Sequence, residues 1–329
     1  MNRVHSNPTP HGHAGRYLSF SFPIWLFQRQ ARDLSFHCVR MRGLSIYNRE
    51  VFPHLFHIGS FALPTYGLMA ALGMTSGLAV IFHLARFRGL DGDQMWNLGG
   101  LAAFSGIVGA KLLMLLVDWR DYLAHPGRIF SVATLQSGGV FSGGLVLAIL
   151  VSWWYVRREK IPFLSAADVF APGVALGHAF GRIGCLAAGC CYGRETHVPW
   201  AITFHNPWAA DFSGTPLNVP LHPTQLYEFA AELINFAFLY WLCKRKKFEG
   251  QIIGLFMMIY GIERFIFEFF RGDPGRGEVL GGLITGTQLI ALGLIVTGFV
   301  IYLKRTPLRS FRSGRIAAVK AESASASRA

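Results

Sequence analysis

Arg182 places a permanent positive charge inside an apolar, glycine-rich stretch, HAFGRIGCLAAGCCYGR, which runs from His178 to Arg194. A guanidinium cannot become neutral by losing a proton, so within a membrane it needs an anion, a polar cavity or water. Two interpretations follow. Either the side chain snorkels or satisfies carbonyls at a helix end, or it belongs to an anion-binding site inside a membrane protein.

A second arginine lies in a comparable setting further along the chain. Tyr260, Arg264 and Glu268 are spaced four residues apart in an apolar stretch, so a helix places them on one face. The same spacing puts His178 one turn before Arg182. A purely structural Arg264–Glu268 ion pair is the alternative. Arginine binds phosphate through two parallel hydrogen bonds and keeps its charge in a dry site, so the pattern favours a phosphate headgroup.

Three other stretches could add polar or flexible groups to such a site. His222 and Glu228 lie in HPTQLYE, directly before an apolar run. Tyr66 begins the first apolar stretch and either anchors it at the interface or lines a cavity. Gly143 lies in the glycine-rich segment 137–144, which either bends around a headgroup or packs tightly against another helix.

The five cysteines do not follow the spacing of a zinc ribbon or a thioredoxin motif. Cys185, Cys190 and Cys191 are interpreted as small buried residues, with a redox or metal role as the alternative. A nucleotide P-loop and an HExxH motif are both absent from the sequence. We therefore predict no metal and no cofactor.

Composition indicates the element that must position these residues, a bundle of membrane-spanning helices. Of 329 residues, 52% are hydrophobic and only 15% are charged, against about 25% charged in soluble domains. Each apolar stretch approaches or exceeds the ~20 residues needed to cross a bilayer. Seven spans are expected, at 61–85, 96–117, 138–156, 166–189, 226–243, 251–270 and 280–303. The predicted fold class is an all-α multi-pass membrane protein.

The net charge of +13 follows the pattern of a membrane topology rather than that of a nucleic-acid surface. Basic residues concentrate in alternate loops and in the C-terminal tail, for example at 86–88, 157–160, 244–247 and 304–315. The positive-inside rule then places the N-terminus of the first span outside and the C-terminus in the cytoplasm. Asp168 lies near the start of the fourth span, where its negative charge is expected to interact favourably with the dipole of that helix.

The chain divides into three parts on this interpretation. Residues 1–52 contain seven arginines on the outer side, which predicts a disordered extension or a later start near Val51. Residues 53–305 form the membrane domain, with an outer loop at 190–225 that is rich in proline and tryptophan. That loop is expected to be a lid or docking surface, or else a structural loop. Residues 306–329 form a basic cytoplasmic tail.

Taken together, the motifs resemble those of the prolipoprotein diacylglyceryl transferases, bacterial inner-membrane enzymes with seven spans. The matching segments occur in family order over roughly residues 55–305. They are PTYGLM at 64–69, GAKL at 109–112, GGVFSGG at 138–144, SAADVFAP at 165–172, GRIGCLAAGCCYGR at 181–194, HPTQLYE at 222–228 and RFIFEFFR at 264–271. The resemblance implies transfer of diacylglyceryl from phosphatidylglycerol to the lipobox cysteine of a prolipoprotein, with release of glycerol phosphate.

The same resemblance implies roles for individual residues. Arg182 corresponds to the arginine that binds phosphatidylglycerol, and Arg264 with Glu268 corresponds to a functional pair. Polar or glycine positions around the cavity are matched by Tyr66, Gly143, Gly193, His222, Glu228 and Tyr260.

Two positions depart from the family pattern. Many members have histidine, a candidate base, at Ser142, and asparagine at Cys185. A serine is too weak a base to replace a histidine directly. We therefore expect that deprotonation of the thiol falls to His222, His178 or Glu268, or to no single base.

Two rival functions use the same features. A non-catalytic phospholipid carrier or flippase would move lipid without modifying any peptide. A thiol-redox membrane enzyme would depend on Cys185, Cys190 and Cys191. The order of motifs over seven spans favours the transferase, whose expected partners are phosphatidylglycerol and prolipoprotein signal peptides, with no nucleic acid.

Overall fold

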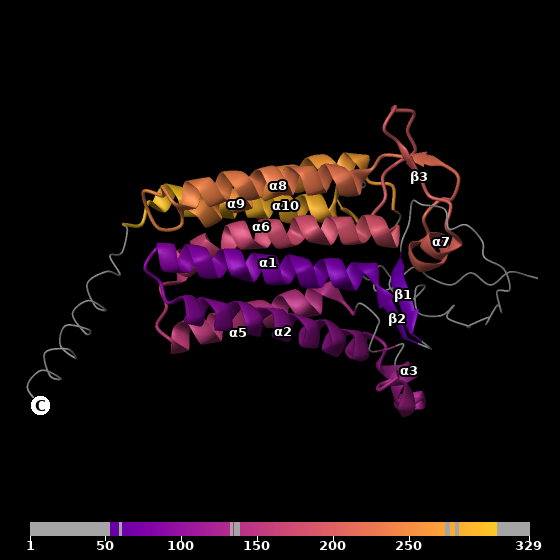
Figure 1. Ribbon diagram of the computed structural model, residues 1–329, viewed down its shortest axis with the longest axis horizontal. Helices are drawn as coiled ribbons and strands as arrows, with labels where there is room; N and C mark the ends of the chain where they lie inside the picture. Colours follow the sequence, from indigo (N-terminus) through magenta and orange to yellow (C-terminus); the bar gives the residue numbers. More distant parts are fainter. Residues whose placement is uncertain are drawn as a thin grey trace, which may run out of the picture. The chain divides into compact units, whose positions relative to one another are not determined.

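The computed structural model describes residues 53–58, 61–131, 134, 139–273, 277–279 and 283–307. Seven helices of 17 residues or more dominate this part of the chain (Figure 1). They are α1 (Thr65–Phe87), α2 (Gly92–Val117), α5 (Phe141–Arg158), α6 (Phe163–Ala188), α8 (Thr224–Cys243), α9 (Gln251–Phe267) and α10 (Gly286–Lys304). Each coincides with one of the seven expected spans. The predicted extension and most of the predicted tail lie outside the described residues.

Shorter elements cap the bundle or connect its helices. They are β1 (His54–Ile58), β2 (Phe61–Pro64), α3 (Trp119–Ala124), η2 (Pro126–Arg128), β3 (Ile202–Thr203), α7 (Pro207–Ser213), β4 (Pro220–Leu221), η3 (Glu268–Phe270), β5 (Glu278–Val279) and β6 (Ile284–Thr285). The strands form three antiparallel pairs, β1–β2, β3–β4 and β5–β6. The loop predicted at 190–225 is ordered around a small core of Tyr192, Phe204 and Leu221.

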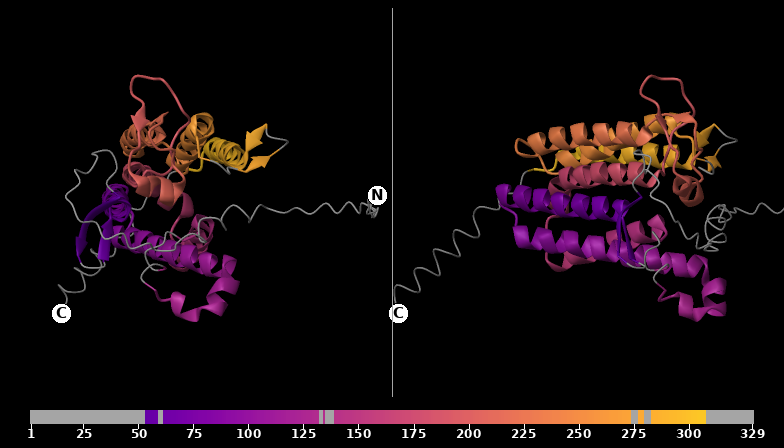
Figure 2. Two further views of the ribbon diagram at one scale, coloured as in Figure 1. Left: turned by 90° about the vertical axis from the view of Figure 1, so that its right-hand side faces the viewer. Right: turned by 45° about the vertical axis from the view of Figure 1, so that its right-hand side comes forward.

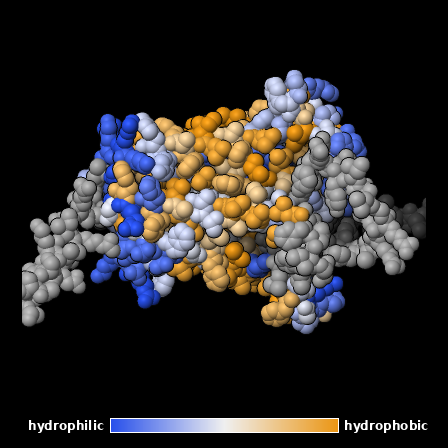
Figure 3. Space-filling view, viewed as in Figure 1, coloured by the Kyte–Doolittle hydropathy of each residue, from blue (hydrophilic) through white to orange (hydrophobic). Residues whose placement is uncertain are grey.

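The bundle is all-α and built for a membrane, as predicted. Within the described part of the chain, five helices are long and apolar enough to span a bilayer, namely α1, α2, α6, α8 and α10. Large apolar side chains point outward along them, among them Phe104, Leu116, Ile234 and Ile290, each more than 60% exposed. Figure 3 shows the resulting apolar band between two hydrophilic ends. Such a band is typical of a surface that faces lipid.

Helix α6 lies at the centre of the bundle and contacts α1, α8 and α9. Figures 1 and 2 show α8, α9 and α10 on one side of it and α1, α2 and α5 on the other. Glycines allow the closest approaches. A Cβ at Gly77 would lie 2.7 Å from the Gly173 carbonyl oxygen, so only glycine lets α1 and α6 pack this closely.

The end of the bundle where α5 and α8 terminate carries basic side chains stacked on aromatic rings. Arg157 lies over Trp153 at 5.1 Å and Arg245 over Trp241 at 4.6 Å. Because arginine and tryptophan both favour the membrane–water boundary, these pairs indicate that this end lies at an interface.

The role of Asp168 differs from the one that the sequence predicted. Although it lies in the second turn of α6, its buried carboxylate accepts hydrogen bonds from the backbone N–H groups of Gly250, Ile252 and Ile253 at the start of α9. Lys246 Nζ also contacts it at 2.9 Å. Asp168 therefore stabilises the N-terminus of α9 rather than the dipole of its own helix.

Candidate active site

Glu228, in the second turn of α8, is shared by three arginines from different parts of the chain. Its Oε2 lies 2.7 Å from Arg182 Nη2 and 3.2 Å from Arg264 Nη1. Its Oε1 lies 3.3 Å from Arg271 Nη1. The carboxylate is 2% exposed, and the side chains of Arg182 and Arg264 are 12% and 13% exposed. The two arginines singled out in the sequence therefore share one partly enclosed site.

A chain of hydrogen bonds fixes the guanidinium of Arg182 from behind. Arg182 Nε donates to His178 Nε2 at 3.1 Å, and His178 Nδ1 lies 2.7 Å from Glu232 Oε1. Since Arg182 can only donate, His178 Nε2 must be the acceptor and Nδ1 carries the proton that Glu232 accepts. The edge of the His178 ring also meets Tyr260, at 5.5 Å between ring centroids. The lone pair of His178 is therefore already engaged.

The expected pairing of Arg264 with Glu268 is present. Arg264 Nη2 lies 3.6 Å from Glu268 Oε2, and the Thr285 hydroxyl donates to Glu268 Oε1 at 2.8 Å. Thr285 is the N-cap of α10, so this contact joins the ends of α9 and α10. Both carboxylate oxygens of Glu268 thus have partners.

Arg271, which the sequence placed only at the end of the segment RFIFEFFR, also belongs to this cluster. Its Nε and Nη2 each bind a carboxylate oxygen of Asp273 at 2.8 Å, and Nη1 contacts Glu228. Burial opposes its charge, but the pairing with Asp273 outweighs this and raises the pKa of Arg271. Arg194 Nε donates to the Arg271 backbone carbonyl at 3.1 Å. Glu232 was missed as well, although it lies one helical turn after Glu228.

His222 lies beside this cluster, in the segment that enters α8. Its Nδ1 is 3.2 Å from the Tyr227 hydroxyl, which also accepts a hydrogen bond from Trp200 Nε1 at 2.7 Å. Among the described residues, His222 Nε2 has no hydrogen-bond partner. When Nδ1 carries the proton, Nε2 therefore has a free lone pair, which His178 lacks.

Gly193 holds the loop against His222 and the end of η3. A Cβ at this position would overlap the His222 backbone carbonyl and would lie 3.0 Å from the Phe270 carbonyl oxygen. Gly193 also pairs with Arg271 in a single antiparallel bridge. Because Gly193 has no side chain, its backbone can lie directly against the segments that carry His222 and Arg271, and it brings these two segments together.

Tyr66 and Gly143 both lie at contacts between helices, Tyr66 between α1 and α6 and Gly143 between α2 and α5. Tyr66, 47% exposed, begins α1, where its ring would lie 3.0 Å from a Cβ at Gly184 of α6. Gly143 packs in the α2–α5 pair, where a Cβ would overlap Leu113 and lie 2.5 Å from the Gly109 carbonyl oxygen. Tight helix packing, one of the two alternatives for segment 137–144, therefore accounts for Gly143. The structure does not bring it together with the arginines.

A crevice too narrow to hold a water molecule adjoins Arg264 and is lined by His178, Glu228, Glu232, Tyr260, Glu263, Arg264 and Phe267. A larger opening of about 300 Å³ lies elsewhere, between residues 89–95 and 159–162, and its lining includes neither Arg182 nor Arg264. The narrow crevice is the one with the relevant chemistry, because its wall includes Arg264 and Glu228.

Comparisons with known proteins agree with the motif analysis. The family model described as "Prolipoprotein diacylglyceryl transferase" matches residues 53–304. A phosphatidylglycerol–prolipoprotein diacylglyceryl transferase of Clostridium tetani is 33% identical over 251 residues, which are 76% of this chain and 96% of the relative. A second such enzyme, from Clostridium perfringens, is 35% identical over 238 residues, 72% of this chain and 89% of the relative. The Coxiella burnetii enzyme is 34% identical over 262 residues, 77% and 95% of the two chains.

Proposed function

This chain belongs to the prolipoprotein diacylglyceryl transferase family, and we propose that the cluster around Glu228 is where it carries out its reaction. The protein is an enzyme that transfers a diacylglyceryl group from phosphatidylglycerol to prolipoproteins. The observation that supports the proposed site is the convergence of Arg182, Arg264 and Arg271 on one buried carboxylate. Three guanidiniums around one anion suit the phosphodiester of a lipid headgroup.

The acceptor is the thiol of the lipobox cysteine. Its sulfur forms a bond to the terminal glyceryl carbon of the diacylglyceryl group, and the bond between that carbon and the phosphate oxygen breaks. The electron pair of the broken bond leaves with glycerol phosphate, and the thiol proton goes to a base. Because the nucleophile comes from the substrate, the chain itself needs no serine or cysteine nucleophile.

Arg182 and Arg264 stabilise the negative charge that grows on the departing phosphate. In the resting site both guanidiniums contact Glu228 Oε2, so the lipid phosphate exchanges with this carboxylate as it binds. Glu232 and His178 hold Arg182 in place from behind. Stabilisation of developing charge by fixed donors is typically the largest contribution to such catalysis.

The base that we favour is His222, through its Nε2 nitrogen. His178 is excluded from this role in the resting site because its Nε2 already accepts from Arg182. Both oxygens of Glu268 also have partners. A free thiol has a pKa of about 8.5, so some thiolate is present at neutral pH and the base contributes only part of the rate.

The finer topology is also part of the proposal. Residues 53–305 form the transferase domain, and the enzyme lies in the bacterial inner membrane with all seven long helices spanning it. The Glu228 cluster faces the outer side and the C-terminus lies in the cytoplasm, in accordance with the distribution of basic residues. This places the site on the side where the lipobox cysteine arrives after secretion.

Incubation of the purified protein with phosphatidylglycerol and a peptide containing a lipobox cysteine tests the proposal. Mass spectrometry should show the peptide heavier by one diacylglyceryl group, with glycerol phosphate released in equal amount. Phosphatidylethanolamine and a Cys→Ser peptide are the controls. A lipid carrier or flippase would instead move labelled lipid between leaflets and leave the mass of the peptide unchanged.

A further inference from the structure

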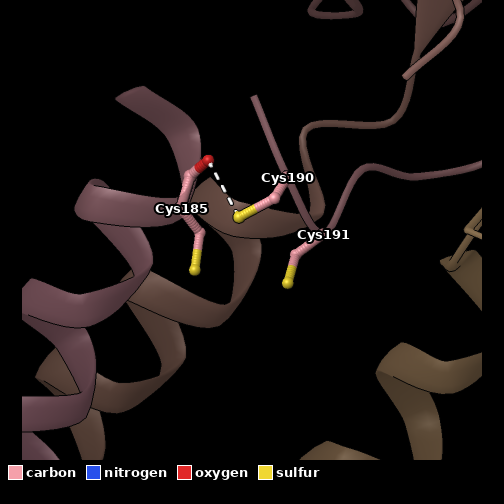
Figure 4. Close-up of side chains that lie close together, drawn as sticks. All are labelled: Cys185, Cys190 and Cys191. Atoms are coloured by element: carbon pink, nitrogen blue, oxygen red, sulfur yellow. Dashed lines mark hydrogen bonds between the residues drawn. The ribbon is translucent and has the colours of Figure 1, made fainter. Parts of the chain in front are cut away.

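Three cysteine side chains converge beside the cluster of arginines. The sulfur atoms of Cys185, Cys190 and Cys191 all lie within 4.8 Å of one another, and none is in a disulfide. Figure 4 shows the three side chains grouped where α6 ends and the following segment turns back. The sequence spacing C-x4-C-C did not indicate this cluster, because the backbone turn between the cysteines creates it.

The end of α6 builds the cluster through its own capping geometry. Gly189 adopts a left-handed conformation with φ of 74°, and the Cys190 backbone N–H then donates to the Cys185 carbonyl at 3.0 Å. Cys191 also has a positive φ, 62°. A non-glycine residue keeps this conformation only when the surrounding structure constrains it, so the fold fixes the backbone of Cys191.

The start of α8 supports the same two residues. Gln225 Nε2 donates to the Cys190 carbonyl at 2.7 Å, and the Thr224 hydroxyl donates to the Cys191 carbonyl at 2.8 Å. The backbone that carries Cys190 and Cys191 is therefore fixed by hydrogen bonds to α8.

Two positively charged side chains lie near the cluster. Arg271 and Arg182 are close enough to interact electrostatically with Cys191, so their positive charges would offset part of the negative charge of three thiolates. The cluster is partly buried, so a bound thiolate would be shielded from bulk water.

We propose that Cys185, Cys190 and Cys191 form a three-thiolate site for a thiophilic d¹⁰ cation, Zn²⁺ or Cu⁺. Sulfur atoms bound to one such ion at about 2.3 Å lie roughly 3.8–4.0 Å apart, so small side-chain rotations from the present arrangement suffice. Each thiol loses its proton to solvent as its bond to the ion forms. Soft thiolate ligands select such cations over Mg²⁺ or Ca²⁺.

The bound ion would join the last turn of α6 to the segment that leads to Gly193. This segment carries the backbone next to Arg271 and His222. The site is therefore structural, and its existence does not depend on the assignment of catalytic residues.

Metal retention by the full-length, untagged protein in detergent tests the proposal. The reduced protein is loaded with Zn²⁺ or with Cu⁺ in separate arms, passed over a chelating resin, and its metal content is measured by mass spectrometry. We expect about one ion per chain in at least one arm. Loading with Co²⁺ should give sulfur-to-metal charge-transfer absorption.

Two sets of variants distinguish this cluster from other thiols. Replacing all three cysteines, C185S/C190S/C191S, should abolish retention, and each single Cys→Ser change should weaken it. Cys243→Ser is the matched control, because Cys243 is buried in a separate core cluster and should leave retention unchanged. Circular dichroism and size-exclusion elution verify that each variant is folded.

Three outcomes would overturn the proposal. One is that the wild-type protein retains neither cation. Another is that the triple variant retains as much metal as the wild type does. The third is that two of these cysteines are joined in a disulfide in protein isolated in the presence of the metal.

Discussion

Arg182 on α6 and Glu228 on α8 meet at 2.7 Å, the shortest of the contacts that join the three arginines to this carboxylate. The pair connects the glycine-rich end of one helix to the beginning of another. Both side chains are largely enclosed, so their charges depend on each other more than exposed charges would. Four predictions follow from this site and from the bundle that supports it.

Replacing Arg182 by alanine should reduce the rate of peptide modification by ~10²–10³, as expected for removal of one donor to a developing anion. The loss of stability should stay below the roughly 3–5 kcal/mol typical of a broken buried ion pair, because Arg264 and Arg271 still contact Glu228. The double variant Arg182→Ala/Glu228→Gln should be less stable than the single variant and equally inactive, because Arg264 and Arg271 then lose their shared carboxylate. Normal turnover by folded Arg182→Ala would disprove the phosphate-binding role.

The two histidines should respond differently to conservative replacement. In His178→Gln, the amide can still accept from Arg182 and donate to Glu232, so this variant should keep most of its activity while His178→Ala loses it. His222→Ala should be slow and should recover in part when imidazole is added. Turnover with peptide and phosphatidylglycerol measures both effects. If His178→Gln is as inactive as His178→Ala, positioning of Arg182 does not explain the role of this residue.

Gly193→Ala should impair the site without unfolding the bundle. The added Cβ overlaps the His222 carbonyl, so the loop must move and carry His222 away from the arginines. We expect a loss of at least tenfold in kcat/KM, equivalent to about 1.4 kcal/mol. Gly100→Ala is the matched control, since a Cβ there meets nothing within 4 Å and alanine favours a helix. Equal rates for the two variants would argue against this role.

Asp168→Ala should lower the free energy of unfolding, although Asp168 does not belong to the Glu228 cluster. The change leaves the N–H groups at the start of α9 without their acceptor and removes one of the two carboxylate partners of Lys246. The expected cost is roughly 3–5 kcal/mol, measured by unfolding in detergent. Asp93→Asn, at an exposed position in α2, serves as the control and should change stability little. A wild-type melting temperature for Asp168→Ala would show that the contact is dispensable.

Helical spacing accounts for what the sequence predicted well. Arg264 with Glu268, and His178 with Arg182, each lie four residues apart on one helix, and both pairs are in contact. Apolar length likewise located all seven long helices. These features depend only on local periodicity, which a single sequence displays.

The features that the sequence did not predict depend on contacts between different helices. Arg271 follows the end of α9 and reaches Glu228 on α8, and Asp168 on α6 binds backbone groups of α9. Neither contact has a characteristic spacing, because each depends on how two helices pack. For Gly143, the sequence left open whether its segment bends around a headgroup or packs against a helix, and close contact with Gly109 and Leu113 of α2 favours packing. Glu232, one turn after Glu228 in an apolar helix, was the signal that could have been used.

The sharing of Glu228 among three guanidiniums has a consequence for turnover. In the absence of lipid, the carboxylate of Glu228 pairs with all three guanidiniums, which lowers their affinity for inorganic anions. On the same proposal, the net binding free energy of the lipid is the difference between the interactions of its phosphate and those of the Glu228 carboxylate with the arginines. On the mechanism that we propose, Glu228 would also compete with glycerol phosphate for the same guanidiniums and so favour release of this product.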